Sequence, residues 1–113
     1  MMFYDFEAGN KSYRLRLSTR NIVSLEKQLG CNPLAIFGDG STIPTVSVMV
    51  AILFHSLQQY NHGITMDGAY DIFDNYIADG HSMTDFVPVI LEIYKVSGII
   101  KEGTTAEGGN EKN

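Results

Sequence analysis

The side chains of this chain that could do chemistry are three histidines, one cysteine and a group of carboxylates. The histidines are His55, His62 and His81, which fall on three different segments, without the i, i+4 spacing that places two metal ligands on one helical face. Cys31 is the single cysteine, which excludes an internal disulfide, and its position after Gly30 predicts a small buried apolar residue. No Gly-x-Ser-x-Gly turn follows a predicted strand, so a nucleophilic triad is not indicated.

The carboxylates Asp67, Asp71 and Asp74 recur with helical spacing after Thr65. General acid–base catalysis needs carboxylates in a cleft that shifts their pKa, and a surface helix offers none. The loop at residues 38–41 contains glycines but lacks the lysine of a phosphate-binding loop. We therefore predict a protein that is not an enzyme and uses no metal or cofactor. The aspartates form either a solvated helix face or a docking site for a basic partner.

The length and charge of the chain restrict its class. A chain of 113 residues has the size of one domain, which we place at residues 1–100, followed by a disordered tail at residues 101–113 that lacks large apolar residues. The formal net charge is −5, and residues 61–94 contain no Lys or Arg, which argues against binding to nucleic acid. The sequence has no secretory signal pattern, and its longest apolar run is too short to cross a bilayer. We expect a soluble, cytoplasmic protein that contacts no membrane.

The first 17 residues predict a β-hairpin. Apolar and polar side chains alternate over residues 2–8 and again over residues 12–17, and Gly9-Asn10 is a typical turn pair between them. We expect the basic side chains of the second strand to pair across the hairpin with Asp5 and Glu7.

Helical spacing begins after the hairpin. Ser18 or Thr19 can cap a helix that ends at Leu29, with Gly30 in a left-handed conformation, and Asn32-Pro33 can open a further short turn. We predict an α+β fold, mainly α, in which the hairpin is followed by about four helices over residues 18–98 in a small bundle.

The central helix is expected in the run from Ile43 to Leu57, in which Ser47 is the only polar residue between Val46 and Phe54. Such a segment must be covered from several sides. Pro44 suits the first turn of this helix, Ser41 or Thr42 can cap it, and it is expected to continue toward residue 60.

Two further helices complete the predicted bundle. Thr65 can cap the third, and its apolar stripe consists of Met66, Ala69, Tyr70, Phe73, Tyr76 and Ile77. Ser82 with Asp85, or Thr84 alone, can cap the fourth, which places Pro88 near its first turn. Ser97-Gly98 ends this helix, and Ile99 and Ile100 can pack back on it.

The chain also has more apolar residues than a small monomer needs. Two helices are apolar almost all round, and the chain contains six Tyr and six Phe. Either these helices pack on each other and on the hairpin, or they leave apolar surface for a partner. For the second case we expect the central helix to contribute, together with the third-helix residues Tyr70, Tyr76, Asp67, Asp71 and Asp74.

Three stretches near the N-terminus carry a family resemblance: Leu15-Arg16-Leu17, the segment from Asn21 to Gly30 that ends in Leu25-Glu26-Lys27-Gln28-Leu29-Gly30, and Asn32-Pro33-Leu34-Ala35-Ile36. In these stretches the chain resembles the tail assembly chaperones of long-tailed bacteriophages and prophages. The similarity covers about residues 10–98 and extends to the order of elements, with a central apolar helix and an acidic helix opened by Thr65. It implies a non-enzymatic, mainly helical protein of virion morphogenesis. Such a protein binds the tape-measure protein, and tail tube subunits as further partners, in the cytoplasm of the bacterial host cell. In that family a longer frameshifted product is common, and here it would join after Ile100.

Two other hypotheses remain open at this stage. The protein could be a structural virion component, such as a head–tail connector or minor tail protein, that assembles through its N-terminal hairpin by strand addition. It could also be a metal-dependent enzyme that uses His55 and the aspartates of the third helix. The sequence does not decide the oligomeric state, and a homo-oligomer is among the open alternatives.

Overall fold

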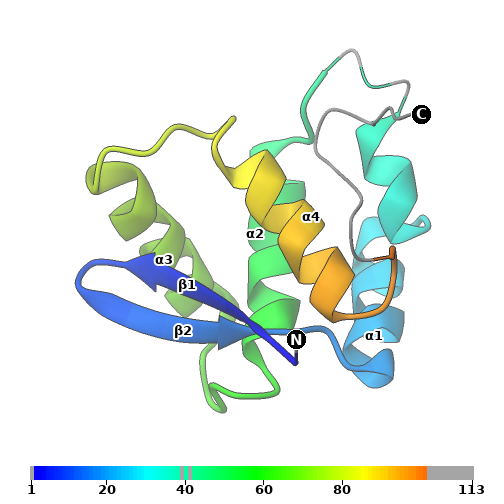
Figure 1. Cartoon of the computed structure of the whole chain (residues 1–113), viewed down its shortest axis with the longest axis horizontal. Coiled ribbons are helices and arrows are strands. Elements are labelled where there is room, and N and C mark those ends of the chain that lie inside the picture. The colour runs from blue at the N-terminus through cyan, green and yellow to red at the C-terminus, as the bar shows by residue number, and fades with distance from the viewer. Residues whose placement is uncertain (1, 39, 41, 102–113) are drawn as a thin grey trace.

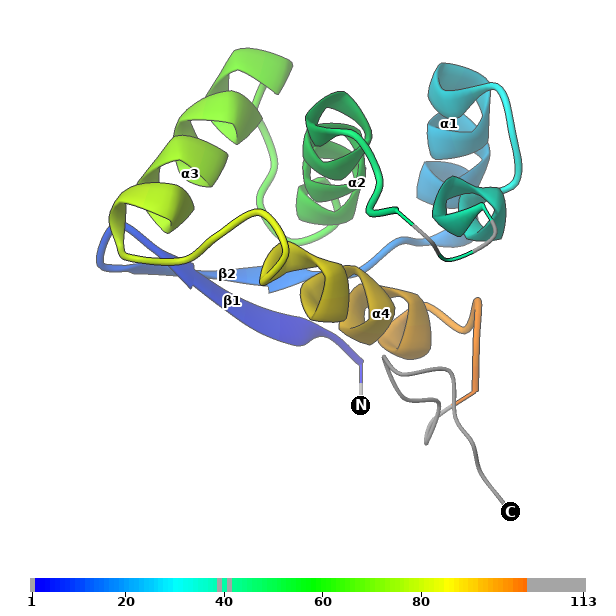
Figure 2. The same ribbon diagram turned by 90° about the horizontal axis from the view of Figure 1, so that it is seen from above.

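The computed structural model describes residues 2–38, 40 and 42–101, and it forms two layers (Figure 1 and Figure 2). Three helices lie side by side in one layer, with α2 in the middle, and the hairpin and the last helix form the other layer. The elements are β1 (Tyr4–Ala8), β2 (Lys11–Leu15), α1 (Thr19–Leu29), the 3₁₀ helix η1 (Pro33–Phe37), α2 (Val46–Leu57), α3 (Met66–Ala78) and α4 (Phe86–Val96). The predicted class, a hairpin followed by helices in an α+β fold that is mainly α, is confirmed.

The hairpin has the predicted turn. β1 and β2 are antiparallel with Ala8 opposite Lys11, and Gly9 and Asn10 both have positive φ, of 59° and 67°. Glycine and asparagine tolerate this conformation, which gives the turn a twist that matches the strands. The predicted ion pairs across the strands are not formed within the described residues. Asp5 lies opposite Arg14, but the Arg14 guanidinium lies 4.6 Å from the centre of the Phe3 ring.

α1 begins and ends where the sequence predicts. The Ser18 side chain accepts a hydrogen bond from the Asn21 backbone N–H, and Gly30 is left-handed with φ 74°. The predicted burial of Cys31 is wrong, because its side chain is exposed. Cys31 lies between Gly30, which ends α1, and Asn32, which caps η1, and it therefore stays outside the core.

α2 begins later than predicted. Thr45 is its N-cap, with extended backbone angles, and its side chain accepts a hydrogen bond from the Val48 backbone N–H at 3.3 Å. Pro44 therefore precedes the cap, and Thr42 does not cap the helix. The helix ends at Leu57. Met49 to Leu53 are all buried, which confirms that this helix is covered from several sides.

α3 has the predicted limits, whereas the N-cap position of α4 is Asp85, without a side-chain cap hydrogen bond, and not Ser82 or Thr84. Thr65 caps α3, and Pro88 lies in the first turn of α4. Ser82 and Asp85 exchange hydrogen bonds in the turn before α4, where each backbone N–H donates to the other side chain. Ile99 and Ile100 pack back on the core after Gly98. The predicted tail, apart from Lys101, and residues Asp39 and Ser41 of the predicted loop lie outside the described residues.

The core joins the two layers through aromatic side chains. The Phe6 ring lies 5.0 Å from the Tyr76 ring and 5.9 Å from the Phe86 ring, measured between centroids. The buried Tyr94 hydroxyl of α4 donates to the Pro33 carbonyl oxygen at 2.9 Å, which fixes η1 to α4. Most of the apolar excess is therefore used inside the molecule. Among the described residues, no helix has both the length and the apolar character needed to span a membrane.

Candidate partner-binding surfaces

The exposed side of α3 brings together four of the five residues predicted to bind a partner. Asp67, Asp71 and Asp74 are exposed, and Tyr70 is 45% exposed between them. Their spacing of three and four residues places them on one side of the helix. We call these four residues the α3 acidic face.

Tyr76 does not belong to this face, and its predicted role as a surface residue is wrong. It is only 4% exposed, and its ring stacks on the His81 ring with centroids 4.2 Å apart. Burial, and after it the charge of Asp85 and the neighbouring Tyr4, raise the pKa of its hydroxyl to about 12. Tyr70 and Tyr76 are six residues apart, which is about one and two-thirds turns of an α-helix, so their side chains point in different directions from α3.

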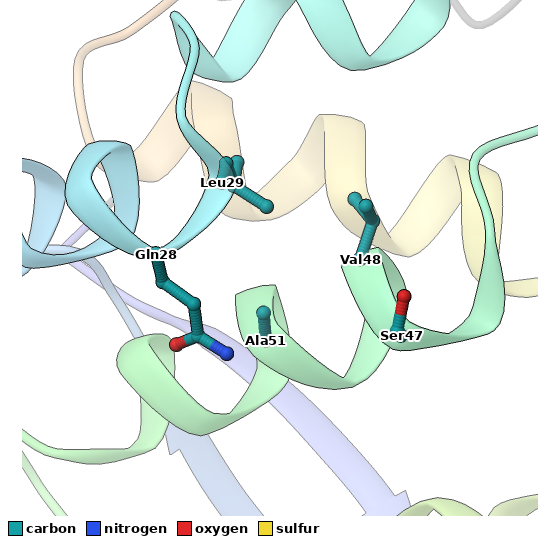
Figure 3. A pocket seen from close by; sticks show the side chains of 5 residues that line it. All are labelled: Gln28, Leu29, Ser47, Val48 and Ala51. Atoms are coloured by element: carbon teal, nitrogen blue, oxygen red, sulfur yellow. The ribbon is translucent and has the colours of Figure 1, made fainter.

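A second surface lies between α1 and α2 and was not predicted. A hollow of about 230 Å³ is lined by Gln28, Leu29, Ser47, Val48 and Ala51, and we call it the α1–α2 groove (Figure 3). Ser47 and Ala51 are one turn apart on α2, and their small side chains leave this space open. Most of α2 is buried, and the side of it that lines the groove is formed by Ser47, Val48 and Ala51.

The Gln28 side chain in this groove is held by a histidine of α2. The His55 Nε2 atom lies 2.7 Å from the Gln28 Oε1 atom, and His55 is itself buried. Burial lowers the pKa of His55, which favours the neutral imidazole. A neutral ring that donates its Nε2–H to the amide oxygen satisfies this geometry. His55 therefore has a structural role at the base of the groove.

The groove belongs to an interval of the chain in which Asp39 is the single charged residue. Between Lys27 and Asp67 the only Asp, Glu, Lys or Arg is Asp39, which lies outside the described residues. Exposed large apolar side chains of the same interval are those of Leu34, Ile43 and Val46. The centres of protein interfaces are depleted of charge, and exposed apolar groups often mark a binding site. This almost uncharged interval is the sequence feature that could have revealed the surface.

One family comparison bears on this arrangement. The sequence pattern of a family of unknown function, DUF6096, matches residues 4–110. The chain belongs to this family. The match spans the hairpin and all the helices described above, so the DUF6096 region includes both the groove and the α3 acidic face. Searches among curated proteins and among solved structures found no match.

The histidines of this DUF6096 protein lie in separate surroundings. His55 contacts Gln28, whereas His81 stacks on Tyr76 near the end of α3. Within the part of the chain that the structure describes, no group of three or more His, Cys, Asp or Glu side chains could hold a metal ion. The fold therefore does not bring His55 and His81 together.

Proposed function

We propose that this protein is a tail-assembly-chaperone-like protein of a bacteriophage or prophage. It binds the tape-measure protein in the cytoplasm of the bacterial host cell, contacts tail tube subunits during tail morphogenesis, and catalyses no reaction. The observation that carries the proposal is the α1–α2 groove, whose lining residues are uncharged. The same interval of the chain also contains the exposed apolar residues Leu34, Ile43 and Val46.

A groove between two helices suits the apolar side of a third helix. In helix-in-groove recognition, apolar residues at helical spacing enter the groove while the polar side of the partner stays in water. The resemblance to tail assembly chaperones implies a partner of this kind, because a tape-measure protein is largely an amphipathic helix. The fold supports the proposal as well, since the hairpin, the glycine-ended α1, the apolar α2 and the acidic α3 follow the order expected of that family.

The size of the apolar contribution can be estimated. Leu34, Ile43 and Val46 are 37–45% exposed, and complete burial of such a side chain is worth about 1.5–3 kcal/mol. Burial of the exposed fraction of all three therefore contributes on the order of 2–4 kcal/mol in total. The α3 acidic face adds attraction for a partner with basic side chains, and this attraction acts mainly on the rate of association.

Co-expression with the product of a very long open reading frame downstream of this chain's own, the candidate tape-measure protein, tests the proposal. We expect a soluble complex in an affinity pull-down, whereas the tape-measure protein alone is insoluble. The double variant Ile43→Ser and Val46→Ser should recover much less complex, because it removes apolar surface and keeps the Thr45 cap. Val23→Ser is the matched control, since Val23 is an equally exposed apolar residue on α1.

Three outcomes contradict the proposal. The wild-type chain could fail to bind or solubilise the tape-measure protein, or the double variant could bind as well as Val23→Ser does. The third is detection of the chain in purified mature particles, which favours the structural virion component, because a chaperone leaves before the particle is complete.

A further inference from the structure

The two edges of the hairpin differ in how their backbone groups are used. At the outer edge of β2, the Asn61 side-chain amide donates to the Arg14 carbonyl oxygen at 2.9 Å. Just beyond β2, the Arg16 backbone N–H donates to the Ser56 carbonyl oxygen at 2.9 Å. The end of α2 therefore covers this edge.

The outer edge of β1 has no such cover. The two-residue turn makes Ala8 and Lys11 a hydrogen-bonded pair, and every second pair along the strands is then hydrogen-bonded as well. The backbone N–H and C=O groups of Asp5 and Glu7 consequently point away from β2. No hydrogen bond to these four groups occurs among the described residues.

A hollow of about 300 Å³ lies beside this free edge. Its lining consists of Tyr4, Asp5, Phe6, Glu7, Tyr76, His81 and Val89. Val89 belongs to α4. Asp85 is four residues before Val89 and Glu92 three residues after it, so both lie on the same side of the helix as Val89. The carboxylates of Asp85 and Glu92 thus lie near the tyrosines of the hollow, whereas the Asp5 and Glu7 side chains lie on the exposed face of β1, beside its free edge.

The surroundings of the two tyrosines agree with this arrangement. Burial, and after it the charge of Glu92, raise the pKa of Tyr4, and Asp85 acts in the same way on Tyr76. Positive groups near the hollow include Lys95 of α4 and Arg14, which lies opposite Asp5 on β2. Lys95 binds Glu92 at 3.0 Å, and the His81 ring lies 3.9 Å from Asp85. Asp5 and Glu7 form no ion pair within the described part of the chain.

We propose that the free edge of β1 and the adjacent hollow bind an extended, basic segment of a partner protein. The partner's backbone pairs with the outward N–H and C=O groups of Asp5 and Glu7, as in strand addition to a sheet edge. Side chains of an extended segment alternate between the two faces of a sheet, so every second residue, Lys or Arg, lies beside the exposed Asp5 and Glu7 side chains, while the residues between them face the hollow. This inference goes beyond the proposed chaperone function and does not depend on it.

Charge argues against a second copy of the chain as the occupant. Antiparallel pairing of two β1 strands centred on Phe6 places Asp5 opposite Glu7 of the partner subunit, and it does so twice by symmetry. Directly opposed like charges destabilise an antiparallel pair. A basic strand instead places opposite charges at the same positions.

Titration of the full chain with synthetic peptides tests this inference. The probe is an acetylated, amidated peptide that alternates Lys and Val, and the comparison peptides alternate Glu and Val or carry N-methyl groups on every second amide. We expect binding of the Lys peptide with slower hydrogen exchange at the amides of Asp5 and Glu7. The Glu peptide and the N-methylated peptide should not bind, because one lacks the charge and the other the backbone donors.

A pair of isosteric variants locates the site. Asp5→Asn with Glu7→Gln should raise the dissociation constant of the Lys peptide about tenfold and reduce its dependence on salt. Glu26→Gln removes a carboxylate from α1, outside the α3 acidic face and the free edge of β1, and should leave the dissociation constant unchanged. An equal effect of Glu26→Gln and of the double variant, no binding at millimolar peptide, or dimers of the chain that the Lys peptide does not disrupt would each overturn the inference. Since none of these measurements uses the tape-measure protein, failure here is distinct from failure of the chaperone proposal.

Discussion

Substitution of the two tyrosines of α3 by serine should give opposite results. Tyr76→Ser removes a ring from the core, where the Phe6 ring lies 5.0 Å away and the His81 ring 4.2 Å away. Tyr70→Ser removes a ring that is already 45% exposed. Tyr and Ser have similar helix propensities, and both variants make the same exchange within α3. The difference between their free energies of unfolding therefore reports mainly the packing of the two side chains.

The expected difference is large compared with the stability of a small domain. Truncation of a buried aromatic side chain costs about 3–5 kcal/mol, whereas a surface substitution usually stays within about 0.5 kcal/mol. With a urea m-value of about 1–3 kcal/mol per molar, Tyr76→Ser should lower the unfolding midpoint by about 1 M or more. Tyr70→Ser should leave the midpoint almost unchanged.

Urea unfolding followed by far-UV circular dichroism measures both free energies of unfolding. Tyr76→Phe is the control, because it keeps the ring, and no hydrogen bond of the Tyr76 hydroxyl is seen among the described residues. It should cost much less than Tyr76→Ser. If Tyr76→Ser lost less than about 1 kcal/mol, the typical cost of a surface or minor change, the packing of α3 described here would be refuted.

Two further predictions concern buried polar groups. Tyr94→Phe leaves the Pro33 carbonyl oxygen without its donor, so it should lower the free energy of unfolding by about 1–3 kcal/mol, measured in the same urea assay. The pKa of His55 is lowered in the folded state. Below the ordinary histidine pKa of 6.5 the unfolded chain therefore binds more protons than the folded chain, and the free energy of unfolding should decrease as the pH is lowered. Urea titrations between neutral and mildly acidic pH should show this fall in the wild type and a smaller one in His55→Gln, and equal slopes would contradict the assignment.

The parts of the fold that the sequence predicts well are those fixed by a few neighbouring residues. Ser18 and Thr65 cap the helices that follow them, and Gly30 adopts the left-handed conformation that ends α1. Gly9 and Asn10 likewise determine the turn of the hairpin. Each of these features depends on backbone conformation and short-range hydrogen bonds, which the local sequence specifies.

The parts that the sequence predicts poorly depend on tertiary packing. Periodicity places Tyr70 and Tyr76 in one broad apolar stripe, but only the position of the hairpin and α4 decides that Tyr76 is covered and Tyr70 is not. Cys31 has the residue type of a core position, yet the two turns around it keep it exposed. The groove exists because Ala51 of α2 lies beside Leu29 of α1, and no local pattern relates these two residues.

The estimated energies indicate that burial of the exposed Leu34, Ile43 and Val46 side chains does not by itself hold a partner firmly. Association costs on the order of 4–15 kcal/mol in lost translational and rotational freedom, which exceeds the 2–4 kcal/mol estimated for burial of Leu34, Ile43 and Val46. A stable complex therefore needs additional contacts. The α3 acidic face and the groove belong to the helical layer, whereas the free edge of β1 belongs to the hairpin layer (Figure 2). A partner that uses both layers contributes one segment to each. If both segments belong to one partner, binding of the first raises the effective concentration of the second, and two weak surfaces then give one stable complex.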